Sequence, residues 1–233
     1  MTALTAPTDL HLAEPGESTG LVAFLERLLR FDRAAAVRLQ AVPRGDGEGV
    51  LALFGRLPLG GSGALAIRTV RLAGLESGAD RTVSAGQLLE ALDESTGTLV
   101  LPPAVTGPSW AGLLPPRTGW ELIAEPSGPE VGRQLADGIR EFRERSEAVP
   151  AHHRTRPVLD ALADEIWSRP IEAVPELPLR AAHAAHVIGF LPPDAPLTVH
   201  RKGSWLRLNT PLGSVAVRSQ AGPGAGLGLS PLV

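Results

Sequence analysis

The chain has 233 residues, of which 43% are hydrophobic and 20% charged, and its net charge is −3. These values are typical of a globular protein and exclude a wholly disordered chain. No cysteine is present, which excludes disulfides, thiolate nucleophiles and cysteine-ligated metals. The sequence has no secretory signal at its start and no stretch approaching the roughly 20 apolar residues of a membrane span. We therefore expect a cytoplasmic protein without membrane association.

The first two thirds of the chain predict an α+β fold. Apolar residues recur at helical spacing in 18–32 and then alternate with polar residues in three segments joined by short turns, 35–42, 50–56 and 64–72. Three antiparallel strands are expected there. A short helix capped by Ser84 follows, and further strands (97–102 and 119–125) and a helix (128–148) complete the order α-βββ-α-ββ-α. This order predicts an antiparallel sheet flanked by helices.

The last third predicts a smaller unit. Helical patterns over 158–168 and 179–190 precede a β-hairpin between 197 and 218. We expect an α+β sheet domain over 18–147 and a helix-helix-hairpin unit over 155–218. Both ends of the chain are rich in Gly, Pro and small polar residues, so 1–17 and 219–233 are expected to be disordered.

The segment 102–119, the Pro/Trp loop, is the most unusual stretch. Two proline pairs bracket Trp110, and loops this long in compact domains are usually functional or disordered. Trp110 either packs into its own domain or forms an exposed anchor for a partner, since Trp is enriched at binding hot spots. The candidate partner-binding residues are Trp110, Leu113, Leu114 and Arg117.

His183 and His186 lie three residues apart on one face of an otherwise apolar helix. Two imidazoles could bind a metal, but zinc requires three or four ligands, and no H-E-x-x-H carboxylate is present. We expect the pair to be packed in the C-terminal unit, with one ring bonded to the backbone, and we expect no metal or other cofactor. A metal-dependent hydrolase using both histidines is kept as a third reading of the function.

The C-terminal unit also allows a nucleic-acid reading, because helices followed by a basic hairpin occur in winged-helix proteins. The candidate contacts are Arg201, Lys202, Trp205 and Arg207. The helix before the hairpin, 179–190, carries one Arg and two His among mostly apolar residues. Such a helix cannot read base edges, and only the hairpin could contact nucleic acid. Nucleic-acid association is therefore kept as the alternative function and not as the main one.

No phosphate-binding loop or nucleophile elbow is found, and no catalytic residue is assigned. The phrases "TVSAGQLLEAL" and "WAGLLPPRTGWE" resemble a family of uncharacterised proteins from GC-rich Gram-positive bacteria, to which no activity is assigned. The N-terminal element order is similar to that of type III secretion chaperones and YbjN-like domains. That resemblance implies a twisted antiparallel sheet flanked by helices and a role in binding other proteins. We therefore expect a non-catalytic, adaptor or chaperone-like protein whose partner is another protein.

Overall fold

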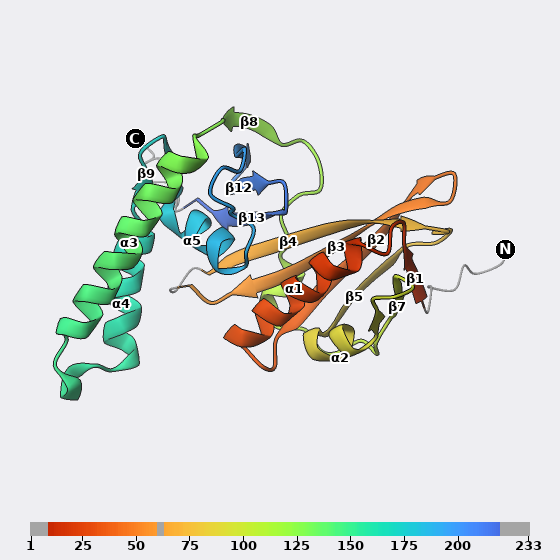
Figure 1. Cartoon of the computed structure of the whole chain (residues 1–233), viewed down its shortest axis with the longest axis horizontal. Coiled ribbons are helices and arrows are strands. Elements are labelled where there is room, and N and C mark those ends of the chain that lie inside the picture. The colour runs from red at the N-terminus through yellow and green to blue at the C-terminus, as the bar shows by residue number, and fades with distance from the viewer. Residues whose placement is uncertain (1–8, 60–62, 220–233) are drawn as a thin grey trace, which may run out of the picture.

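The computed structural model describes residues 9–59 and 63–219. The predicted α+β class is confirmed: a large antiparallel sheet is flanked by helices (Figure 1). The α-helices of this part of the chain are α1 (Glu17–Phe31), α2 (Ala85–Glu90), α3 (Gly128–Ala148), α4 (Arg156–Trp167) and α5 (Leu179–Val187). Two 3-10 helices are η1 (Ser109–Gly112) and η2 (Ala151–His153).

Eleven strands form the main sheet, whose central path runs β5-β2-β3-β4-β13-β12-β11-β8. Strand β1 joins this path by pairing with both β4 and β7, and β6 pairs with β7. A separate small sheet contains β9 and β10. The strands are β1 (Asp9–Leu12), β2 (Ala36–Gly45), β3 (Glu48–Leu57), β4 (Ala64–Ala73), β5 (Ala79–Ser84), β6 (Leu92–Asp93), β7 (Thr98–Val100), β8 (Glu121–Ala124), β9 (Pro170–Ile171), β10 (Val174–Pro178), β11 (Thr198–Lys202), β12 (Trp205–Thr210) and β13 (Gly213–Arg218).

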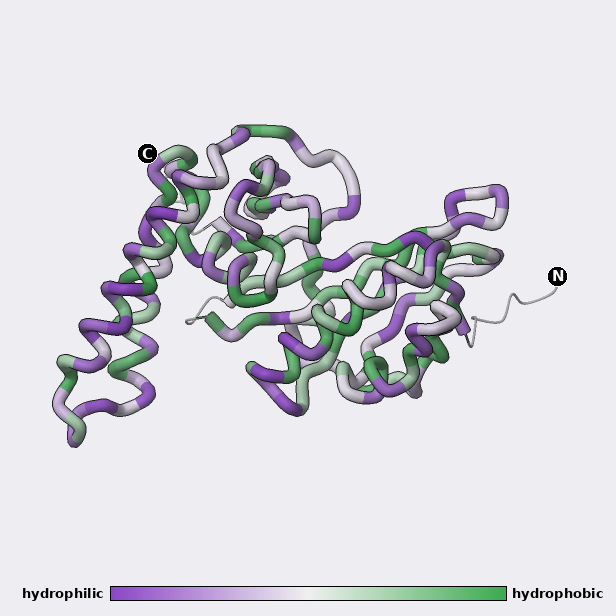
Figure 2. The backbone as a smooth tube through the Cα atoms, viewed as in Figure 1, coloured by the Kyte–Doolittle hydropathy of each residue, from purple (hydrophilic) through white to green (hydrophobic). Residues whose placement is uncertain are grey.

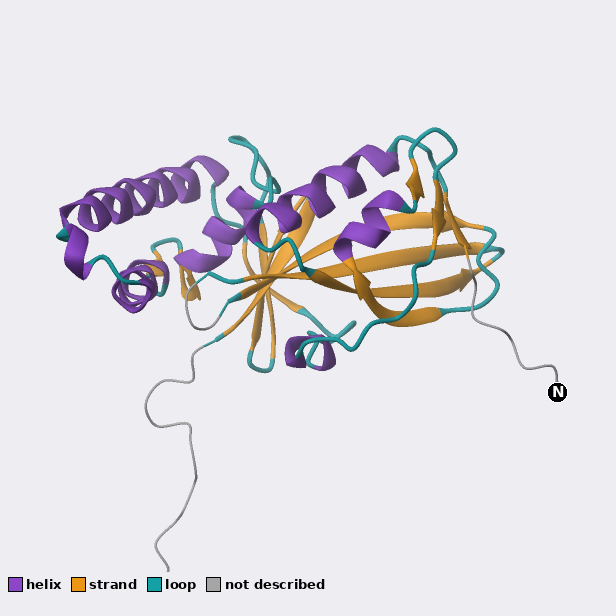
Figure 3. Cartoon of the chain, turned by 90° about the horizontal axis from the view of Figure 1, so that it is seen from below, coloured by secondary structure: helices purple, strands orange, loops and turns teal. Residues whose placement is uncertain are grey.

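The helices α1 and α2 cover one face of the sheet, called the inner face here (Figure 3). The period-two pattern of β2 directs Val37 and Leu39 into this core, and both are fully buried. Helix α1 meets them with a stripe of leucines at helical spacing. Ser84 caps α2 as expected, because its side chain accepts a hydrogen bond from the backbone N–H of Gln87.

The C-terminal strands join the N-terminal sheet, so the two expected units contribute to one sheet. Strand β13 pairs with β4, with Ala216 opposite Leu65, and β8 pairs with β11 instead of extending the N-terminal strands. The physical reason lies in β13, where residues 214–217 are all buried. A strand buried on both faces belongs in the middle of a sheet. Independent folding of the units 18–147 and 155–218 stays a prediction.

The N-terminal segment corrects another expectation. Residues 1–17 were expected to be disordered, but 9–12 form strand β1 and α1 begins at Glu17. Leu10 and Leu12 are buried because β1 fills the space between β4 and β7. The remaining expected disorder, at 1–8 and 220–233, lies outside the described residues.

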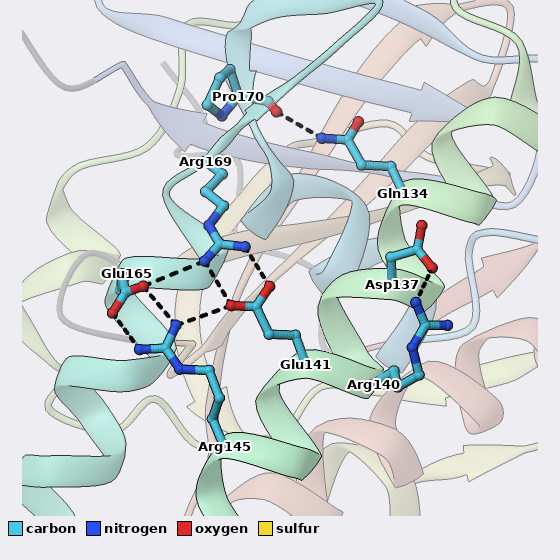
Figure 4. A network of polar contacts seen from close by, with 8 residues as sticks. All are labelled: Gln134, Asp137, Arg140, Glu141, Arg145, Glu165, Arg169 and Pro170. Atoms are coloured by element: carbon cyan, nitrogen blue, oxygen red, sulfur yellow. Dashed lines mark hydrogen bonds and ion pairs between the residues drawn. The ribbon is translucent and has the colours of Figure 1, made fainter.

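Helices α3 and α4 form an arm that projects from the sheet (Figure 1). The exposed side of the arm carries an ion-pair network in which Glu141 accepts hydrogen bonds from Arg169 (2.5 and 2.8 Å) and Arg145 (3.0 Å) (Figure 4). The hydrogen bonds from Arg169 and Arg145 lower the pKa of the Glu141 carboxyl group to about 2. Hydrophilic and hydrophobic residues alternate along α3 (Figure 2). The arm therefore has a charged outer surface and an apolar inner seam.

Candidate functional site: an aromatic pocket on the outer face of the sheet

The face of the sheet opposite to α1 and α2, called the outer face, carries a second hydrophobic cluster. Strand alternation places its side chains on the side away from the inner core. The outer cluster consists of Phe54, Leu65, Ile67, Trp205 and Ala216. The Pro/Trp loop crosses this cluster and packs the partly buried side chains of Trp110 and Leu114 on it, and Trp120, which lies between the loop and β8, adds a third.

Hydrogen bonds at both ends hold the Pro/Trp loop in place. Near its start, the backbone N–H of Val105 donates to the carbonyl of Thr82 on the edge strand β5 (2.9 Å). Near its end, the indole N–H of Trp120 donates to the carbonyl of Pro116 (2.8 Å). The 3-10 helix η1 lies between these points and carries Trp110. The loop is thus a fixed cover that presents Trp110 from a short helical turn.

A pocket of about 540 Å³ opens between η1 and the sheet. We call it the aromatic pocket, because two indole side chains lie among its walls. Its volume falls within the range of about 300–1,000 Å³ that is typical of ligand pockets. The residues that matter for its chemistry are Arg56, Leu65, Trp110, Leu113, Trp205 and Arg218.

Both charged side chains at the aromatic pocket are arginines. The guanidinium of Arg218 lies over the ring of Trp205, 4.9 Å from its centroid. The described ranges, 9–59 and 63–219, contain every Asp and Glu of the chain, and within them no carboxylate lies at ion-pair distance from Arg56 or Arg218. The pocket therefore combines apolar walls with two positive charges that no Asp or Glu of the described ranges neutralises.

The structure divides the four predicted partner-binding residues. Trp110 is half-buried and Leu113 is 54% exposed, and both line the aromatic pocket. Leu114 is half-buried against the outer cluster. Arg117 is exposed beside a smaller hollow of about 210 Å³ on the other side of the loop. Trp110 thus packs on its own domain and also faces solvent, and the binding role of the four residues stays a prediction.

The structure separates one of the four predicted nucleic-acid contacts, Arg201, from the other three. Arg201 forms ion pairs with Glu176 (2.9 Å) and, more loosely, Glu121 (3.8 Å). Arg207, on the outer face, donates to the hydroxyl of Ser214 (2.9 Å), and burial lowers the pKa of its guanidinium. Trp205 is only 8% exposed, whereas Lys202 is exposed. Alternation along β12 places Trp205 and Arg207 on the outer face, and Lys202 lies opposite Trp205, whereas Arg201 lies opposite Leu206 of the inner core. A role for these residues in binding nucleic acid stays an untested prediction.

The two histidines lie in different environments. The ring of His183 stacks on Trp167 at 3.9 Å between centroids, and its Nδ1 has no hydrogen-bond partner, so the expected bond from a ring to the backbone is not formed by this nitrogen. Burial, with a smaller contribution from the nearby His186, lowers the pKa of His183 to about 4. His186 is exposed. In the part of the chain that the structure describes, no three His, Asp or Glu side chains come together as a metal site.

Sequence reasoning missed Arg56, Leu65 and Arg218 as parts of a site. One signal was available in β4, whose start, "ALAI", is continuously apolar. Such a run indicates a strand buried on both faces and therefore a hydrophobic cluster on the outer face as well. The convergence of Arg56 and Arg218 had no comparable signal, because it depends on the pairing of β13 with β4.

Two family models match the chain. Residues 5–112 match a domain of unknown function (DUF8010), and residues 115–222 match another domain of unknown function (DUF8185). These matches agree with the expected likeness to uncharacterised proteins. No curated protein matches the chain. The junction between the two matched segments falls at residues 113–114 in the Pro/Trp loop, so the aromatic pocket draws its walls from both segments.

No helix among the described residues is both long and apolar enough to cross a membrane.

Proposed function

We propose that this protein is a non-catalytic protein-binding module and that its aromatic pocket receives an apolar side chain of another protein. The observation that carries the proposal is that exposed Leu113 and half-buried Trp110 line a pocket whose floor includes Leu65, Trp205 and Ala216 of the outer cluster. Aromatic side chains held by a rigid scaffold are favourable anchors, because little conformational entropy is lost when they bind.

The position of the pocket supports the proposal. Binding sites occur preferentially where two structural units meet, and the aromatic pocket lies where the two matched family segments meet. The prolines that flank η1 restrict the backbone of the loop, since the pyrrolidine ring holds φ near −65°. In this proposal the protein acts as a bacterial, cytoplasmic adaptor or chaperone-like protein, with nucleic-acid association as the alternative.

A selection from a phage-displayed library of random peptides on the full chain tests the proposal. We expect the enriched peptides to share an apolar residue and to change the tryptophan fluorescence of the protein when they bind. Leu113→Asp should weaken their binding at least about tenfold, equivalent to about 1.4 kcal/mol, because it places a charge at the pocket mouth. Leu122→Asp is the matched control, since Leu122 is 50% exposed on β8 and does not line the pocket.

Two results would contradict the proposal. One is a selection in which no peptide is enriched over the empty support. The other is a set of peptides that bind equally well to the Leu113→Asp and Leu122→Asp variants, since these peptides would be using another surface.

A further inference from the structure

We infer that the aromatic pocket selects acidic peptide segments, in which a carboxylate adjoins the apolar anchor and pairs with Arg56 and Arg218. This inference rests on the proposed function and adds the chemical class of the occupant. It follows from the combination of an apolar hollow with two arginines at its edge, which neither the sequence motifs nor the family matches assign.

Arg56 has room at the edge of the pocket because a glycine lies beside it. It lies near the end of β3, and its side chain passes over Gly63, where a Cβ atom would come within 2.9 Å of the Arg56 Nε. Gly63 has a φ of +62°, a conformation that L-residues rarely adopt. The glycine thus leaves space for the guanidinium, which remains exposed and available to a ligand.

Arg218 is positioned by Trp205. The two residues lie opposite each other on β13 and β12, and the guanidinium covers the indole at 4.9 Å. The ring attracts the cation over its face while the N–H groups of the guanidinium stay free to donate. The position of Arg218 is therefore favoured before any ligand binds, and less entropy is lost when a carboxylate pairs with it.

Arg56 and Arg218 differ from another arginine of the outer face, Arg38, in having no carboxylate partner among the described residues. Arg38 donates to Asp80 at 2.6 Å, so its charge is already neutralised within the chain. Arg56 and Arg218 have no such carboxylate in the described ranges, which hold all the acidic residues. Because apolar walls lower the local dielectric constant, a carboxylate in the pocket would pair with them more strongly than on an open surface.

A peptide carboxylate fits this site better than a single-stranded nucleic acid does. Proteins that bind single-stranded nucleic acids contact the backbone with positive charges and stack the bases on aromatic rings. One face of the Trp205 ring is occupied by Arg218, and only 8% of the residue is exposed. A base could not stack there without displacing the arginine, whereas a carboxylate would bind the arginine where it lies.

The same phage library, selected in parallel on the full wild-type chain and on the Arg56→Gln, Arg218→Gln double variant, tests the inference. On the wild type we expect Asp and Glu to be enriched beside the apolar anchor. On the double variant we expect the apolar anchor to persist without the acidic enrichment. Both arginines are exposed, so the double variant should fold, and its thermal melting curve checks this.

Synthetic versions of an enriched peptide then measure the size of the effect. Replacing its Asp by Asn, or its Glu by Gln, should weaken binding to the wild type about tenfold, equivalent to about 1.4 kcal/mol. The same replacement should have little effect on binding to the double variant. Arg44→Gln serves as the control, because Arg44 is an exposed arginine in β2 that does not line the pocket.

The outcomes separate the inference from the proposed function. Peptides with an apolar anchor but no acidic enrichment would overturn the inference and leave the proposed function standing. Acidic enrichment that persists on the double variant would also overturn it, because other residues would then read the charge. A poly-dT oligonucleotide that binds through Arg56 and Arg218 and displaces the peptides would overturn it in favour of nucleic acid. The absence of any enriched peptide would contradict the proposed function itself.

Discussion

The two faces of the sheet are built from the same strands but are covered in different ways. On the inner face, α1 and α2 bury a continuous core that includes fully enclosed residues such as Leu39 and Leu53. On the outer face, a single loop crosses a cluster of five buried residues. The sequence of β3 serves both faces at once, with Leu53 pointing to the helices and Phe54 to the loop.

The difference shows how a cover determines whether a surface can bind. A helix is about 10 Å wide with its side chains and fills the space above several strands, so α1 and α2 enclose core residues such as Leu39 and Leu53. The Pro/Trp loop is thinner, and a pocket remains open beside it. Functional side chains are commonly found on loops that a rigid scaffold positions. The outer face of this molecule has that arrangement.

Replacing Trp205 tests whether the outer cluster is a true second core. Trp205 is 8% exposed in the centre of the outer cluster, so we expect Trp205→Ala to lower the free energy of unfolding by about 3–5 kcal/mol. Trp110 is only half-buried, and Trp110→Ala should cost less, roughly 1–2 kcal/mol. Denaturant unfolding followed by circular dichroism measures both values.

Equal losses for the two variants would show that the loop is as tightly packed as the sheet, and the contrast between the two faces would fail. As an inner-face reference, Leu53→Ala should cost about 2–5 kcal/mol, because it leaves a cavity in an enclosed core.

The elements whose patterns are local were predictable from the sequence. The alternation in β2 and the leucine spacing of α1 each report burial on one face. Strand β1 was missed because four residues with two buried leucines are too short to show a period. Its formation depends on pairing with β4 and β7, which a local pattern does not contain.

The pocket was predictable only in part. The Pro/Trp loop was identified as a candidate because its length and its Trp are unusual, and Trp110 and Leu113 do line the pocket. The arginines at its edge come from strands far apart in the chain, and their proximity results from the pairing of β13 with β4. A long-range pairing of this kind leaves no signal at a fixed spacing.

Acidification should expose a weak point in the inner core. His183 is half-buried on α5 and packs on Trp167 of α4, which belongs to this core, and burial lowers the pKa of His183 from 6.5 to about 4. In the unfolded chain the ring gains its proton near pH 6.5, whereas the folded protein resists protonation until about pH 4. Stability should therefore fall as the pH drops from 6.5 to 4, by about 3 kcal/mol in total. Denaturant titrations at several pH values measure this loss.

The variant His183→Leu should remove most of this pH dependence, and His186→Leu should preserve most of it. His186 is exposed, and its charge is the smaller of the two causes of the shift. If wild type and His183→Leu lose stability in parallel between pH 6.5 and 4, another group controls the acid response, and the inner core is not weakened at this ring.

The smallest expected effect on stability is the one that most clearly separates the two faces. Leu113 is 54% exposed at the mouth of the aromatic pocket, so Leu113→Ser should change the free energy of unfolding by no more than about 0.5 kcal/mol. The same variant should weaken the binding of selected peptides, because it removes apolar area that the partner would bury. Unfolding curves and peptide titrations on one preparation measure the change in stability and the change in binding affinity.

A loss of stability comparable with that of Leu53→Ala would mean that Leu113 supports the fold, and the outer face would then be a second core with an incidental hollow. Unchanged stability with weakened binding would show that this leucine remains exposed in order to contact a partner.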